Sequence, residues 1–234
     1  MPRMSSPADM KAVPLFSALA DEDVSALLPC IQHRSYAARS IILQPGQRTE
    51  WLYVILSGRV KVLVEDTDGR ELTLSLLGPN EFFGEIEIID GQPCSATVEA
   101  CGVCDVLCVP RKGIIECLRH NADAAMWMLG TVAARLRDAH RKLESLALLS
   151  VYDRVSRFLL DQGREAANGE WVVESGSQQI ASTVGASREM VSRVVKAMID
   201  KGLVRRHRRK LIVLNRVRIT DRKRWRRQTC AVLP

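Results

Sequence analysis

The segment Ser187–Arg193, with the sequence SREMVSR, carries side chains whose chemistry suits the recognition of DNA bases. An arginine can donate to both O6 and N7 of guanine, and a carboxylate can accept from the N4 amino group of cytosine. Arg188, Glu189 and, one helical turn later, Arg193 are therefore the candidate base-reading residues. Ser187 is a favourable helix N-cap, so the helix is expected to begin here and to present these residues from its N-terminal end.

The residues around this segment have the spacing of a helix-turn-helix. With Ser177 as its first position, a small residue, Ala181, lies where the two helices approach most closely. Gly185 occupies the turn, where a positive φ is easiest for glycine. The apolar positions between the helices are filled by Ile180, Val184, Ala186, Val191 and Val194. Two unrelated core helices are the alternative, but they would not need to meet all of these constraints.

Basic residues in and after this motif predict contacts to the DNA backbone. The segment GLVRRHRRKLIVLN indicates two short strands around a basic turn, which is the wing of a winged helix-turn-helix. Phosphate contacts of this kind add salt-dependent affinity without sequence preference. The complete set of predicted DNA-binding residues is Ser187, Arg188, Glu189, Ser192, Arg193, Lys196, Lys201 and Arg208.

The charge of the chain is unevenly distributed. Residues 150–234 carry 19 lysines and arginines against 8 aspartates and glutamates, whereas residues 1–149 carry 15 against 19. The net charge of +7 therefore divides into +11 and −4. A strongly basic part indicates a polyanionic partner, and the alternative is a basic surface that is merely solvated. The basic end of the chain is expected to contact DNA phosphates or an anionic ligand beside the wing.

The rest of the sequence predicts the elements that position this motif. From Ser35 to Pro110, short runs rich in valine, isoleucine and leucine alternate with glycine turns, as in a compact antiparallel β-barrel or sandwich. From about His120 to Ser150, apolar residues fall at helical steps of three and four. This seam indicates a parallel homodimer, although such a helix can also pack only within its own domain. The seam consists of Leu129, Val132, Leu136, Ala139, Leu143 and Leu146.

A glycine-punctuated β-roll, a long helix and a winged helix-turn-helix in this order resemble the cyclic AMP receptor protein/FNR (Crp/Fnr) family of bacterial transcription regulators, over about residues 12–214. The resemblance implies an α+β fold with an antiparallel β-roll effector domain (1–118), a dimerisation helix (119–150) and a winged helix-turn-helix (151–214), followed by the basic tail (215–234). It also implies three partners: double-stranded DNA with a two-fold symmetric TGTGA-like site, a second copy of the chain, and RNA polymerase.

In this family a phosphate loop holds the cyclic nucleotide. A glutamate accepts a hydrogen bond from the ribose hydroxyl, and an arginine followed by a serine binds the cyclic phosphate. This chain keeps Gly84, Glu85 and Ser95 as candidate ligand-binding residues, but it has Cys94 in place of the arginine and Glu87 where a small residue is expected. The phosphate thus loses a charge-assisted hydrogen bond, which contributes about 1.5–3 kcal/mol, and gains a nearby carboxylate.

The long helix lacks the family's adenine partner as well. Relatives that read adenine use an adjacent threonine–serine pair, and Ala139 and His140 stand at the corresponding positions here. Two independent losses predict that cyclic AMP binds weakly or not at all.

The same helix suggests a different effector. It carries the string RLRD, from Arg135 to Asp138, followed by Arg141. Arginine stacks on guanine and pairs with phosphate, and aspartate accepts from a guanine edge. An R-x-x-D string resembles motifs that hold cyclic di-GMP, to which some family members respond. Cyclic di-GMP is therefore the predicted effector, with no cofactor required. The further candidate ligand-binding residues are Arg135, Arg137, Asp138 and Arg141.

Three alternatives to this effector remain open: a β-roll that binds no nucleotide, cyclic AMP, and a redox signal at the thiols. The cysteines of CGVCDVLC are expected on one strand, where Cys104 and Cys108 share a face and Cys101 points away. That arrangement predicts buried small hydrophobic residues rather than ligands of a metal.

No motif in the sequence indicates an enzyme. The four histidines have no visible serine or cysteine partner in a nucleophile motif, so an enzyme acting on a cyclic nucleotide is only an alternative. No apolar run approaches the roughly 18 residues of a membrane span. We therefore expect a cytoplasmic protein that does not enter the membrane.

Overall fold

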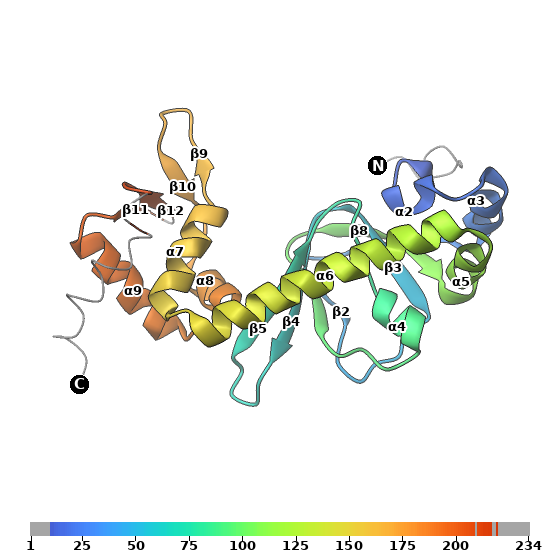
Figure 1. Cartoon of the computed structure of the whole chain (residues 1–234), viewed down its shortest axis with the longest axis horizontal. Helices are drawn as coiled ribbons and strands as arrows, with labels where there is room; N and C mark the ends of the chain where they lie inside the picture. Colours follow the sequence, from blue (N-terminus) through green and yellow to red (C-terminus); the bar gives the residue numbers. More distant parts are fainter. Residues whose placement is uncertain (1–9, 209, 217–218, 220–234) are drawn as a thin grey trace. The chain divides into compact units, whose positions relative to one another are not determined.

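The computed structural model describes residues 10–208, 210–216 and 219 of the 234-residue chain. They divide into two compact units. The first unit combines residues up to Val64 with Thr73–Ala139, and the second combines Glu65–Leu72 with residues from His140 onward. Figure 1 labels many of their helices and strands. Within these ranges, no helix has both the length and the apolar character needed to cross a bilayer.

Two four-stranded sheets form the predicted β-roll (Figure 1). One sheet has the order β1 (Gln32–Tyr36), β8 (Cys104–Pro110), β3 (Trp51–Ser57) and β6 (Phe82–Phe83). The other has the order β2 (Ile41–Leu43), β7 (Thr97–Ala100), β4 (Val60–Glu65) and β5 (Glu71–Leu77). The pairs β1–β8, β3–β8, β3–β6, β2–β7 and β4–β7 are antiparallel, as predicted.

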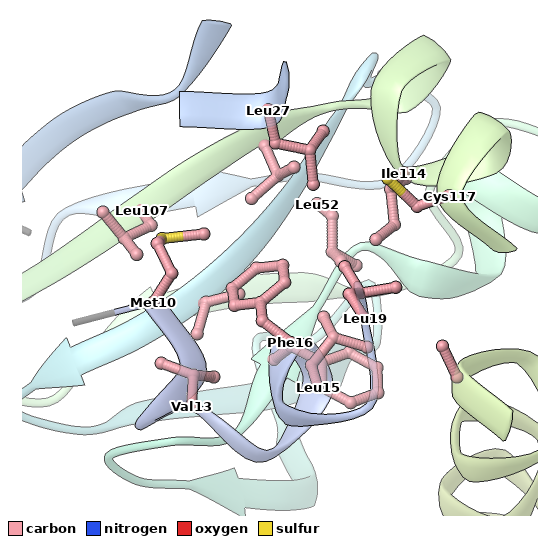
Figure 2. Packing of buried hydrophobic residues seen from close by; sticks show 14 of the residues in the cluster. Met10, Val13, Leu15, Phe16, Leu19, Leu27, Leu52, Leu107, Ile114 and Cys117 are labelled. Atoms are coloured by element: carbon pink, nitrogen blue, oxygen red, sulfur yellow. The ribbon is translucent and has the colours of Figure 1, made fainter. Parts of the chain in front are cut away.

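Strand β3 is buried on both faces. Tyr53 and Ile55 point into the core between the two sheets. Leu52 and Val54 point the other way, into a second core that the N-terminal helices and α5 cover. Figure 2 shows this second core, where Phe16 and other side chains gather near Leu52. The covering helices are α2 (Pro14–Ser17), α3 (Asp21–Leu27), the 3-10 helix η1 (Leu28–Cys30) and α5 (Arg111–His120). Burial on both faces explains why the run WLYVIL is continuously apolar.

One strand expected from the sequence is in fact two. Strand β7 ends at Ala100, and β8 begins at Cys104 in the other sheet. The prediction that Cys101, Cys104 and Cys108 share one strand was therefore wrong, because apolar spacing does not reveal that the chain changes sheets. Cys104 and Cys108 are nevertheless both buried in the core between the sheets, whereas Cys101 is exposed.

Helix α6 (Ala122–Leu148) begins in the core of the first unit. The side-chain oxygen of Asn121 accepts from the N–H of Ala124 at 2.9 Å and thereby caps the first turn. The amide group of Asn121 donates to the carbonyl oxygen of Ala18 at 2.8 Å. Met128, one turn farther on, is buried in the same core. These contacts fix where the helix starts.

Beyond this first part, α6 carries an exposed apolar row. The helix has 27 residues and is thus about 40 Å long. Of the seam predicted from the sequence, Leu136 is 56% exposed and Leu143 is 64% exposed. A row of large apolar side chains on a helix surface is unfavourable in water and is suited to cover by another surface.

The second unit contains the predicted winged helix-turn-helix. Its elements are α7 (Val151–Asp161), β9 (Arg164–Glu165), β10 (Trp171–Val173), α8 (Ser177–Val184), α9 (Arg188–Asp200), β11 (Val204–His207) and β12 (Lys210–Val213). The strands form an antiparallel sheet in the order β11, β12, β10, β9. A capping box starts α7, in which the Ser150 hydroxyl accepts from the N–H of Asp153. Side chains of all three helices and of the sheet share one core.

Candidate functional site

Helices α8 and α9 meet in the turn that the sequence predicted. Gly185 ends α8 with a φ of +63°, and its N–H donates to the carbonyl oxygen of Ala181. This left-handed conformation is the reason for a glycine at the position. The predicted apolar positions pack as expected: Ile180, Ala181, Val184 and Val191 are buried, and Ala186 and Val194 are partly buried against them.

Helix α9 has one buried face and one exposed face. Val191, Val195 and Met198 are buried in the core of the unit. The exposed face carries Arg188, Glu189, Ser192, Arg193 and Lys196. Because residues four apart on a helix are neighbours, Glu189 lies next to Arg193, and Ser192 lies between Arg188 and Lys196. The structure therefore brings the base-reading candidates together on one accessible surface.

The start of α9 is fixed by Ser187. Its hydroxyl oxygen accepts from the backbone N–H of Met190 at 3.2 Å. Hydrogen bonds from the N–H of Glu189 itself and from the Ser187 side chain lower the pKa of the Glu189 carboxyl below its usual value. The carboxylate is therefore ionised at neutral pH and can only accept hydrogen bonds. This end of α9 thus offers donors from two arginines and an acceptor from one glutamate.

The last two DNA-binding candidates lie outside this surface. Lys201 is exposed at the C-cap of α9, and Arg208 lies in the turn between β11 and β12 with a φ of +54°. Other basic residues of the wing are partly neutralised. Arg205 pairs with Glu170 at 2.5 Å, and Lys210 Nζ lies 2.6 Å from a Glu174 oxygen.

The two glutamates of these ion pairs flank β10. The sequence did not reveal the pairs, since they depend on how the strands of the winged sheet are arranged.

The phosphate loop is closed by an ion pair. Gly84 precedes α4 (Glu85–Asp90) with a φ of +84°, and a Cβ there would lie 2.9 Å from the carbonyl oxygen of Trp51. Glu85 is only 5% exposed and accepts from Nη1 of Arg135 at 2.6 Å. Nη2 of Arg135 donates to the carbonyl oxygen of Phe82, also at 2.6 Å, and the guanidinium lies over the Phe82 ring. Two predicted ligand-binding residues, Glu85 and Arg135, therefore bind each other.

The position of the missing arginine is buried. Cys94 is 4% exposed, and its backbone is hydrogen-bonded to Gly46 and Gln47. Burial, reinforced by the nearby Glu87 carboxyl, raises the pKa of the Cys94 thiol to about 11. Burial also raises the pKa of Glu87. Where the family places a cation and a small side chain, this loop has a neutral thiol beside a carboxyl group.

The other ligand-binding candidates are exposed. Ser95 lies on the loop next to Cys94. Arg137, Asp138 and Arg141 lie on the surface of α6, where Arg137 and Arg141 are neighbours at a spacing of four. Arg135, in contrast, is held in the β-roll, so the RLRD string does not present all of its side chains together.

Four of the cysteines are buried and offer little thiolate. Cys94, Cys104, Cys108 and Cys117 are buried, and burial raises the pKa of the Cys94, Cys108 and Cys117 thiols to about 11. Because the thiolate is the reactive form, these groups are poorly suited to redox sensing. Cys30 and Cys101 are exposed. Cys230 and most of the basic tail lie outside the described residues.

A cavity of about 340 Å³ lies in the second unit, lined by the end of α6, by α7 and by the end of α8. Its walls include four basic side chains, Arg141, Lys142, Arg154 and Arg157, and one acidic side chain, Asp161. Of these residues, only Arg141 was predicted from the sequence to bind a ligand. Helical spacing places Arg154 and Arg157 on one face of α7, but only the packing of three helices shows that this face borders a cavity.

Two family models match the chain. The model of the cyclic nucleotide-binding domain matches residues 33–121, and the model of the Crp-like helix-turn-helix domain matches residues 153–222. These ranges include the β-roll with its phosphate loop and the two helices of the helix-turn-helix.

Relatives resemble the chain over most of its length. It is 36% identical over 186 residues to the cAMP-activated global transcriptional regulator Vfr of Pseudomonas aeruginosa, a match that covers 76% of this chain and 87% of Vfr. It is 33% identical over 196 residues to the cyclic AMP receptor protein of Thermus thermophilus, which covers 84% of this chain and 90% of that protein.

A solved structure resembles it as well. The c-di-GMP responsive global regulator CLP of Xanthomonas campestris has a TM-score of 0.75 and 26% sequence identity, covering 84% of this chain and 100% of that one. With a matched β-roll domain, a matched helix-turn-helix and relatives that are transcription regulators rather than enzymes, the chain is a DNA-binding transcription regulator and belongs to the Crp/Fnr family.

Proposed function

We propose that the protein acts as a homodimer on a two-fold symmetric, TGTGA-like DNA site, and that cyclic di-GMP rather than cyclic AMP controls this binding. The observation that carries the effector part is the buried Cys94 thiol beside Glu87, at the position where a cyclic phosphate needs a cation. Arg188, Glu189 and Arg193 read the bases, while Ser192, Lys196, Lys201 and Arg208 contact the DNA backbone.

The loop is unsuited to cyclic AMP. It lacks the cation for the phosphate, and Ala139 and His140 provide no hydroxyl pair for adenine. Cyclic di-GMP has two phosphates and two guanines, which suit the exposed Arg137, Asp138 and Arg141. Arg135 can join them only when its ion pair with Glu85 opens. The name of CLP as a c-di-GMP responsive regulator supports the same choice.

The exposed seam of α6 supports the proposed dimer. Leu136 and Leu143 are more than half exposed in the single chain, and seam residues recur at steps of three and four. Two such helices, packed in parallel, bury the seam and place two copies of α9 in two-fold symmetry. We further propose, from membership of the family alone, that the protein is cytoplasmic and acts with RNA polymerase.

A regulator that needs no nucleotide is the second candidate. The observation in its favour is the Glu85–Arg135 pair, in which two side chains of the chain itself join the phosphate loop to α6. A redox signal is less well supported because most thiols of the described residues are buried and protonated.

Fluorescence anisotropy with labelled duplexes tests the proposal. The full-length protein is titrated onto a symmetric TGTGA-like site and onto a duplex with scrambled half-sites, each with no nucleotide, with cyclic AMP or with cyclic di-GMP. We expect preference for the symmetric site and a change in affinity with cyclic di-GMP alone. A change with cyclic AMP alone contradicts the effector, and equal binding to both duplexes contradicts the site.

A further inference from the structure

The cavity at the end of α6 is electrostatically unusual. Four basic side chains and one acidic side chain line it, and all of them belong to the second unit. Lys142 and Arg154 are partly buried, whereas Arg141, Arg157 and Asp161 are exposed. Removing a cationic group from water without a compensating partner costs free energy, and neighbouring cations add repulsion to that cost.

Arg154 is the residue that distinguishes this cavity from an ordinary basic surface. Its Nε is buried, and it has no hydrogen-bond partner among the described residues. A buried donor without a partner is rare in native proteins and calls for an explanation, of which an unseen ion is one. Burial also lowers the pKa values of Arg154 and Lys142 from their usual ranges, since both charges are removed from water.

We propose that this cavity binds a phosphate-bearing anion and that, in the cell, it receives a phosphodiester group of the cyclic dinucleotide effector. The second clause rests on the proposed function. Arg154 Nε donates to a phosphate oxygen, Arg157 and Arg141 supply further donors, and Lys142 adds charge. Arginine suits this role because its planar donors match phosphate oxygens.

This position also gives the anion a route to the DNA-binding surface. Thr183 and Val184 at the end of α8 line the same cavity as Arg141 of α6 and Arg157 of α7. An anion held by α6 and α7 would therefore lie beside Val184, the residue that precedes Gly185. Gly185 forms the turn that sets the angle between α8 and α9. If its affinity differs between two conformations of the dimer, binding shifts the population of the helix-turn-helix.

Calorimetry on the full-length protein without DNA tests the proposal, with inorganic pyrophosphate and cyclic di-GMP as the two probes. Arg154→Met and Arg157→Met should each weaken both probes at least tenfold, which corresponds to about 1.4 kcal/mol. Arg164→Met is the matched control, because Arg164 is an exposed arginine of β9 that does not line the cavity. It should change neither affinity by more than about twofold.

Thermal unfolding of the ligand-free variants separates binding from a structural role. Arg154→Met replaces an unpartnered buried donor with an apolar chain of similar length, so its Tm should be no lower than that of the wild type. If Arg154 instead had a structural role, this substitution would lower the Tm of the protein. A lower Tm together with unchanged probe affinity would overturn the proposal.

The outcomes separate this proposal from the proposed function. If cyclic di-GMP binds the wild type and Arg154→Met equally, the cavity is not its binding site, but cyclic di-GMP remains the effector. If pyrophosphate binding depends on Arg154 but cyclic di-GMP does not bind, the anion site stands and the effector is wrong. If neither probe binds the wild type, both are wrong. If Arg154→Met weakens DNA binding of the ligand-free protein, the cavity instead holds a DNA phosphate, and the effector-binding role is contradicted.

Discussion

At the scale of the residue, Arg188 is the first side chain to test for base recognition. Arg188→Ala should weaken binding to the cognate site by about 1–3 kcal/mol and relax the preference at one base pair. Lys201→Ala, at the other end of α9, should weaken binding to all sequences nearly alike, because the contact proposed for Lys201 is to phosphate. Anisotropy titrations on cognate and random duplexes measure both. If Arg188→Ala lowers the affinity for the cognate and random duplexes equally, Arg188 is not a base-reading residue.

Cys94 and Glu87 allow the phosphate loop to be tested by gain of function. Cys94→Arg combined with Glu87→Ala should raise cyclic AMP affinity at least tenfold, since a charge-assisted hydrogen bond contributes about 1.5–3 kcal/mol. Cys94→Arg alone should raise the affinity for cyclic AMP less, because Glu87 can pair with the new arginine. Cys101→Arg, at an exposed cysteine, is the matched control. No gain in the folded double variant would mean that the missing adenine partner limits binding instead.

Residue types and spacing predicted much of the candidate DNA-binding surface. The seven helix-turn-helix positions and the N-cap Ser187 follow from local rules, and the structure agrees with them. The Glu85–Arg135 pair could not be predicted in the same way, because its partners are 50 positions apart and meet only when α6 packs on the β-roll. Pairing of Arg205 with Glu170 was missed for the same reason.

At the scale of the element, the seam of α6 makes a prediction about assembly. Leu136→Glu should convert a dimer into a monomer and reduce affinity for a symmetric site, because a charge would be buried between the two helices. Leu148→Glu is the matched control, since Leu148 lies on the same helix, is more exposed than Leu136 and is outside the seam. Light scattering after size exclusion measures the mass. A wild-type monomer at micromolar concentration contradicts the proposed dimer.

The element scale also shows where sequence patterns stop being informative. The period of α6 was evident because apolar residues recur over several turns, and the helix spans Ala122–Leu148 as expected within a few residues. The prediction of a single strand from Cys101 to Cys108 was wrong, since β7 and β8 belong to different sheets. Successive side chains of a strand point to opposite faces, which produces an alternating sequence pattern. A chain that passes from one sheet to another can keep this pattern, so the pattern does not reveal the change of sheet.

At the scale of the whole molecule, the basic tail should affect the salt dependence of DNA binding. Residues 216–227 contain seven lysines and arginines against one aspartate, but most of them lie outside the described residues. Truncation after Ile219 keeps this buried residue and removes the basic residues that follow it. The slope of log affinity against log salt should flatten by about 0.9 for each DNA phosphate that the shortened protein no longer neutralises. An unchanged slope means that the tail does not bind DNA.

The identity of the nucleotide that the intact protein binds is the most direct test of the proposed effector. Full-length wild-type protein is titrated with cyclic AMP and with cyclic di-GMP in a calorimeter under identical conditions. We expect micromolar binding of cyclic di-GMP and weak or no binding of cyclic AMP, because Cys94 and Glu87 stand where the phosphate needs a cation. Micromolar binding of cyclic AMP, or no binding of cyclic di-GMP at millimolar concentration, would contradict the proposed effector.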